Sequence, residues 1–148
     1  MFVVDTNVLV YAADVSAPEH ARCHALLESW RRQRGAWYLT WGICYEFLRV
    51  VTHPRVLRRP WTADAAMSFL AAIQAAPGLE MLVPTERHAA VLSATLAEVP
   101  GLSGNVWHDA ETAIPMREHG VRRIGSRRDT DFHRFPFVER LDPFTDEP

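Results

Sequence analysis

The chain has 148 residues, of which 48% are apolar and 23% charged, and its formal net charge is −2. This size and composition predict one globular domain over 1–148, and the near-neutral charge excludes a basic field over the whole surface. All sixteen basic residues are arginines, which excludes a P-loop because that motif needs a lysine.

The chain begins with a short apolar run at 2–4 that shows no polar alternation. Such a run predicts a strand covered on both faces, as in a parallel sheet. Asp5 follows directly and would lie at the carboxyl end of this strand, where open α/β sheets bind their ligands. The apolar residues at 8–11 then return the chain over the sheet.

Periodicity and capping residues predict alternating helices and strands over the rest of the chain. The expected helices are 18–34, 42–52, 65–76, 86–98 and 106–119. The expected strands are 37–40, 79–83, 121–125 and a short fifth one at 138–141, with an irregular segment at 126–135. In the helix at 86–98 the residues expected to face inward are Ala89, Leu92 and Leu96. This order predicts an α/β fold whose mostly parallel sheet of four to five strands carries helices on both faces.

Two further features concern the compartment of the protein. No apolar run is long enough to span a membrane, and Asp5 interrupts the apolar start before a signal peptide can form. Cys23 and Cys44 have neither metal-binding nor redox spacing, so we expect two reduced thiols. We therefore expect a cytoplasmic protein without a membrane partner.

Four acidic residues fall at comparable places in the predicted fold, after strands or near the starts of helices: Asp5, Glu46, Asp109 and Asp129. In a parallel sheet they would project toward one end, where four carboxylates repel one another unless a cation holds them. Oxygen ligands without a His or Cys set favour Mg²⁺ or Mn²⁺. Such an ion polarises a phosphoryl oxygen and activates water for in-line attack.

Each acid also has a purely structural interpretation. Asp5 is a good helix N-cap residue, and Asp109 suits the positive end of its helix. Glu46 fits a solvated helix edge, and Asp129 and Asp131 fit ion pairs with neighbouring arginines. The functional interpretation is favoured because all these positions converge on one edge of the sheet.

Four motifs follow one another along essentially the whole chain. They are Asp-Thr-Asn-Val-Leu-Val-Tyr at 5–11, Tyr-Glu-Phe-Leu-Arg-Val-Val-Thr-His-Pro-Arg at 45–55, His-Asp-Ala at 108–110 with Glu-His-Gly at 118–120, and Asp-Thr-Asp-Phe-His-Arg-Phe-Pro at 129–136. Together they resemble PIN-domain ribonucleases, above all the VapC-type toxins of bacterial toxin–antitoxin pairs. The resemblance implies a three-layer α/β/α PIN-like fold and Mg²⁺- or Mn²⁺-dependent endonucleolytic cleavage of RNA. It also implies a homodimer and a cognate antitoxin protein that blocks the site.

The resemblance assigns roles residue by residue. The matching catalytic quartet is Asp5, Glu46, Asp109 and Asp129. Three of these, Asp5, Asp109 and Asp129, would hold the divalent ion, and Glu46 would orient or deprotonate the attacking water. The supporting residues are Thr6, Asn7, Ser126 and Asp131.

Two departures from the family pattern bear on this assignment. The family often places a hydroxyl residue two positions before the fourth acid, whereas Ser126 stands three positions before Asp129, which leaves open whether Asp129 or Asp131 faces the metal. Pro115 lies inside the helix that carries Asp109, where we expect a kink or a bend. The alternative function is therefore a catalytically impaired PIN-fold module that binds RNA or a partner without cutting.

Surface residues complete the expectations. Arginine suits phosphate oxygens and stacks on bases, and the residues expected to hold the RNA backbone are Arg55, Arg58, Arg127 and Arg128. Helix surface around Trp30 or Trp61 is the expected docking site of the antitoxin. Trp61 and Trp107 are also candidates for stacking on bases, with core or partner packing as the alternative.

Overall fold

The computed structural model describes residues 1–127 and 131–146, with only the backbone of Asp131. Its strands are β1 (Phe2–Val4), β2 (Trp37–Thr40), β3 (Leu79–Leu82), β4 (Arg123–Gly125) and β5 (Glu139–Leu141). Its helices are α1 (Thr6–Ala13), α2 (His20–Arg32), α3 (Trp41–Val51), α4 (Ala63–Gln74), α5 (His88–Glu98) and α6 (Val106–Glu118), and a 3-10 turn η1 covers Asp131–Arg134.

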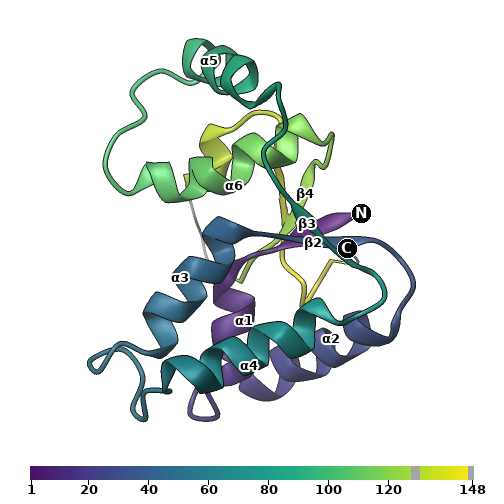
Figure 1. The fold of residues 1–148 in the computed structure, drawn as a ribbon, viewed down its shortest axis with the longest axis vertical. Helices are drawn as coiled ribbons and strands as arrows, with labels where there is room; N and C mark the ends of the chain where they lie inside the picture. Colours follow the sequence, from purple (N-terminus) through teal and green to yellow (C-terminus); the bar gives the residue numbers. More distant parts are fainter. Residues whose placement is uncertain (128–130, 147–148) are drawn as a thin grey trace.

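The five strands form one parallel sheet in the order β3-β2-β1-β4-β5. Helices α5 and α6 lie on one side of this sheet, and α1, α2 and α4 lie on the other together with most of α3 (Figure 1). The predicted three-layer α/β fold with a parallel sheet is therefore confirmed. None of the helices in the described part of the chain is long and apolar enough to cross a bilayer.

The central strand β1 is buried along its whole length, which explains its uninterrupted apolar sequence. It pairs with β2 on one side and β4 on the other, and Val4 lies beside Gly125 in the register. The carboxyl ends of these strands therefore meet at one edge, where Thr40 ends β2, and Asp5 and Ser126 directly follow β1 and β4.

Polar caps set where the helices begin at this edge. The side chain of Asp5 accepts a hydrogen bond from the Thr6 backbone at the start of α1, and that of Thr40 accepts one from Ile43 at the start of α3. Helix α6 starts without a side-chain cap and continues through Pro115 to Glu118, so the proline does not end it.

Two expectations about packing were wrong. Helix α5 buries only Thr95. Of the three residues expected to face inward, Leu92 is partly buried against the core, whereas Ala89 is exposed and Leu96 is 41% exposed. The reason is position, because α6 already covers that side of the sheet and α5 packs outside it (Figure 1). Trp30 belongs to the core, where it is 4% exposed and contacts Phe2 edge-on, so it offers no docking surface. Cys23 and Cys44 are buried free thiols, as expected.

Candidate active site

The best-positioned acid is Asp5, which is 7% exposed at the carboxyl end of the central strand. One carboxylate oxygen, Oδ1, accepts a bond from the Thr6 backbone N–H at 2.7 Å. The other, Oδ2, accepts bonds from the Asn7 amide at 2.5 Å and from the Ser126 hydroxyl at 2.7 Å. Both oxygens are thus held, and the carboxylate has a fixed orientation.

Asn7 and Ser126 also bind each other, which ties two distant segments together beneath Asp5. The Asn7 amide nitrogen lies 2.9 Å from the Ser126 hydroxyl, and the Asn7 amide oxygen accepts a bond from the Arg127 backbone at 2.9 Å. The backbone of Asp5 itself donates to the carbonyl of Gly125 at 3.0 Å. The loop after β4 is therefore anchored to the Asp-Thr-Asn segment by hydrogen bonds on both sides.

The second acid is Glu46, which α3 brings alongside the start of α1. The Thr6 hydroxyl donates a hydrogen bond to Glu46 Oε2 at 2.8 Å, and Arg49 lies 3.4 Å from Oε1. The side chain of Glu46 is 37% exposed, so it is oriented by protein contacts yet reaches solvent. This combination suits a group that exchanges protons with water.

The third acid, Asp109, comes from the opposite layer, because it lies in the first turn of α6. Together with Asp5 and Glu46 it lines a pocket of about 350 Å³, which also contains Thr6 and Asn7. The sequence prediction that Asp5, Glu46 and Asp109 share one edge of the sheet is confirmed by this pocket.

The electrostatics of the pocket appear in the pKa of Asp5, which is raised from 3.8 to about 6. Burial is the largest cause, and the negative charges of Glu46 and Asp109 act in the same direction. The hydrogen bonds from Ser126 and from the Thr6 backbone partly oppose the shift. A deprotonated Asp5 is therefore held at a cost in free energy that a bound cation would offset.

The fourth predicted acid lies outside the described residues, as does Arg128, and the side chain of Asp131 is not described. The structure therefore leaves the choice between Asp129 and Asp131 as it was. Within the described ranges, no three His, Cys, Asp or Glu side chains are close enough to hold a metal ion together. The ligand set that we predicted, with residue 129 as its third member, stays a prediction.

A model of the PIN domain matches residues 2–138 of this sequence. The chain belongs to the PIN-domain family. Ribonuclease VapC48 of Mycobacterium tuberculosis is 30% identical over 141 residues, which cover 95% of this chain and 96% of that protein.

Two solved structures share the fold of this PIN domain. One is M. tuberculosis VapC20, described as a Sarcin-Ricin loop cleaving toxin, with a TM-score of 0.62 and 16% identity over 93% of this chain and 97% of that one. The other is VapBC2 from Rickettsia felis bound to a promoter DNA fragment, with a TM-score of 0.60 and 13% identity over 95% and 96%. At these identities the likeness shows the fold alone.

The arginines that we expected to bind RNA fall into different settings in this PIN domain. Arg55 and Arg58 are exposed in the segment between α3 and α4. Arg127 is half-buried, pairs with Asp142, and lies 3.8 Å from the ring centre of Phe144. Its guanidinium is thus engaged within the protein.

Sequence reasoning missed Arg49 as a residue of the site. It lines the acidic pocket and pairs with Glu46 one helical turn away. The spacing of three residues on the predicted helix was the available signal, because side chains at i and i+3 lie on the same face.

Proposed function

We propose that this PIN domain is a divalent-metal-dependent endoribonuclease and the toxin of a type II toxin–antitoxin pair, acting as one domain over 1–148. Its family and the ribonuclease name of its relative VapC48 support RNA as the substrate. The observation that carries the proposal is the pocket in which Asp5, Glu46 and Asp109 meet, where burial and then the two neighbouring negative charges raise the pKa of Asp5. A cluster in which the ionised form of Asp5 is disfavoured fits a cation-binding site better than a set of surface ion pairs.

The donors of this pocket fit Mg²⁺ or Mn²⁺. They are carboxylate oxygens, with no His or Cys among the described residues that line it, and hard divalent ions prefer such ligands. We propose Asp5, Asp109 and Asp129 as the residues that would hold the ion. When bound, it would supply charge stabilisation to the phosphoryl oxygens and favour ionisation of water.

The side chains divide the remaining work. Glu46 accepts the proton of the water that attacks the phosphodiester, which leaves a 5′-phosphate and a 3′-hydroxyl. Thr6 orients Glu46 through its hydroxyl, whose 2.8 Å bond occupies one carboxylate oxygen. Asn7 and Ser126 hold Asp5 in place, so they act as positioning residues.

The test is incubation of the purified protein with single-stranded RNA and Mg²⁺. We expect cleavage that stops with EDTA and with Asp5→Asn, and that survives in Asp64→Asn, a matched change of an exposed acid in the first turn of α4. Cleavage that persists in EDTA or in Asp5→Asn would falsify the metal assignment. RNA that is bound but never cut in Mg²⁺ or Mn²⁺ would favour the impaired binding module instead.

We also propose an antitoxin protein as the partner and a homodimer as the assembly. The similarity to VapC48, which agrees with the resemblance of the motifs to VapC-type toxins, supports the antitoxin. Coexpression with the product of the adjacent gene should yield a complex that copurifies and does not cleave RNA. Light scattering of the free protein measures the assembly, and a monomer at every concentration would exclude the homodimer.

A further inference from the structure

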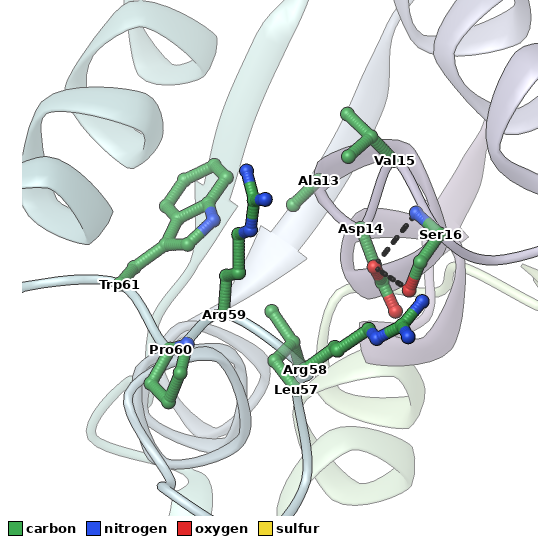
Figure 2. Close-up of a pocket in the computed structure, with 9 residues that line it drawn as sticks. All are labelled: Ala13, Asp14, Val15, Ser16, Leu57, Arg58, Arg59, Pro60 and Trp61. Carbon is green, nitrogen blue, oxygen red and sulfur yellow. Dashed lines mark hydrogen bonds between the residues drawn. The ribbon is translucent and has the colours of Figure 1, made fainter.

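A second hollow of about 480 Å³ lies at the other end of α1, away from the acids. Its walls come from the turn after α1, with Asp14 and Ser16, and from the segment between α3 and α4, with Arg58, Arg59 and Trp61. Figure 2 shows Arg59 beside Trp61 on one side and Arg58 extending toward Asp14 and Ser16 on the other. The two guanidinium groups thus flank one opening.

These two arginines are not used by the fold. Both are exposed, and neither guanidinium makes an ion pair or hydrogen bond with any residue that the structure describes. Asp14 is engaged differently, because its Oδ1 accepts bonds from the Ser16 backbone at 3.0 Å and from the Ser16 hydroxyl at 2.7 Å. The hollow therefore has a surplus of positive charge, which suits an anionic ligand.

Trp61 gives the hollow an aromatic surface as well. Its ring is half-buried and is fixed edge-to-face by Phe47 at 6.2 Å and Phe69 at 5.4 Å between ring centres. Its backbone donates to the carbonyl of Val51 at 2.9 Å. A rigid indole beside free guanidinium groups is the combination on which nucleic-acid bases stack while their phosphates are held.

The hollow adjoins the acidic pocket along both of its walls. Val10 and Tyr11 of α1 line the acidic pocket, and Ala13 lines the hollow. Likewise Val56 lines the former and Leu57 the latter. The eight residues of α1 separate Asp5 from Asp14, and the distance between the two residues is roughly 13 Å at the usual helical rise. An extended RNA strand covers this distance in a few nucleotides.

We propose that this hollow is a subsite for the RNA strand, a few nucleotides from the bond that is cut. Arg58 and Arg59 bind a backbone phosphate, and the base stacks on Trp61. The inference rests on the proposed ribonuclease function, which it deepens by placing the path of the strand along α1. Binding at this subsite is non-covalent.

The test is the binding of a fluorescently labelled oligouridylate of about ten nucleotides, measured in EDTA so that the strand stays intact. We expect Arg58→Gln/Arg59→Gln to bind about tenfold more weakly or worse, and the slope of its affinity against salt concentration to fall by about 0.7, for the one phosphate that the two arginines hold. The matched control is Arg32→Gln/Arg34→Gln, which removes two exposed guanidinium groups at the end of α2. It should bind within about twofold of wild type.

A second variant keeps the proposal falsifiable if the first one misfolds. Among the described residues that line the hollow, Asp14 alone carries a carboxylate, which Asp14→Asn removes while it retains an oxygen for the bonds from Ser16. We expect it to bind oligouridylate a few-fold more tightly, an effect that a loss of structure would not produce.

The outcomes separate this inference from the proposed function. If wild type cuts RNA in Mg²⁺ while the Arg58 and Arg59 variant binds oligouridylate as tightly as wild type, the subsite is overturned and the nuclease stands. If no RNA is cut but affinity still depends on both arginines, the nuclease fails and the subsite stands. If the Arg58 and Arg59 variant keeps its RNA affinity but no longer copurifies with a coexpressed antitoxin, the hollow binds a polypeptide and the inference is overturned.

Discussion

Asp5→Asn should stabilise the metal-free protein at neutral pH, although Asp5 caps a helix. In the folded protein the pKa of Asp5 is raised from 3.8 to about 6. A shift of about two units corresponds to roughly 3 kcal/mol of stability, which is present at low pH and is lost as pH rises through about 6. An amide avoids this loss. The amide keeps only one acceptor oxygen, however, and loss of the hydrogen bonds to the other oxygen costs about 1 kcal/mol.

The net effect therefore changes sign with pH. Near pH 4 the variant should be about 1 kcal/mol less stable than wild type, and near pH 7.5 about 2 kcal/mol more stable. Urea denaturation in EDTA at both pH values measures this difference. A simple capping role predicts a loss of about 1 kcal/mol at both values instead, so a deficit independent of pH would refute the reasoning.

Metal provides the complementary measurement. A ligand that binds only the folded state stabilises that state. Mg²⁺ should therefore raise the urea midpoint of wild type and leave the urea midpoint of Asp5→Asn nearly unchanged. The exposed-acid control Asp64→Asn should respond as wild type does. An equal response of all three proteins would show that the ion binds elsewhere.

Three further changes test other parts of the structure. Glu46→Gln should lower kcat about 10²-fold or more while calorimetric Mg²⁺ affinity stays within a few-fold, with the exposed Glu111→Gln as the unaffected control; a kcat close to that of wild type would remove Glu46 from the chemistry. Glu118 is buried, which alone would raise its pKa, but hydrogen bonds from Thr85 and His88 lower the pKa to about 2. The ionised Glu118 therefore stabilises the fold fully above its usual pKa, and this stabilisation is lost as pH falls toward 2. Glu118→Gln should accordingly cost about 2 kcal/mol at neutral pH by denaturation and little near pH 2, and an equal cost at both would contradict the shift. A Cβ at position 78 would lie 2.6 Å from the backbone oxygen of Gly35, so Gly78→Ala should lower stability by about 1–3 kcal/mol, whereas Gly35→Ala, whose Cβ meets nothing closer than 3.9 Å, should leave the thermal midpoint close to that of wild type.

The order of the strands and helices could be predicted because local signals agreed with the global fold. A continuous apolar run marked β1, and hydrophobic periodicity marked α3 and α4. The predictions failed where burial depends on which layer a helix joins. Helix α5 has the apolar residues of an inward face, yet α6 occupies the space above the sheet. Trp30 failed in the opposite direction. It shares the buried face of α2 with Cys23 and Leu27, and this helical spacing, rather than the exposure expected of a docking residue, decides its place.

Three acids of the site could be predicted from position alone. Asp5 directly follows a buried parallel strand, and Glu46 and Asp109 lie in helices that begin at that same edge. The bonds that orient them could not be read from spacing. Thr6 and Glu46 are forty residues apart, and Asn7 and Ser126 are separated by 119. The register between β1 and β4 decides the second of these contacts, and it depends on the packed sheet as a whole.

The Asp-Thr-Asn segment at the start of α1 links stability to the proposed function. Asp5 caps the helix and lies in the acidic pocket, Thr6 orients Glu46, and Asn7 holds Asp5. Asp5 gains a fixed orientation from its bonds to residues 6, 7 and 126, yet these bonds lower its pKa less than burial and its charged neighbours raise it. A stronger network would hold the anion without help and would weaken the dependence on a cation. A weaker one would let the carboxylate rotate away from Glu46 and Asp109. The segment therefore keeps Asp5 oriented but electrostatically unsatisfied, which is the condition under which the proposed divalent ion would gain most from binding to it.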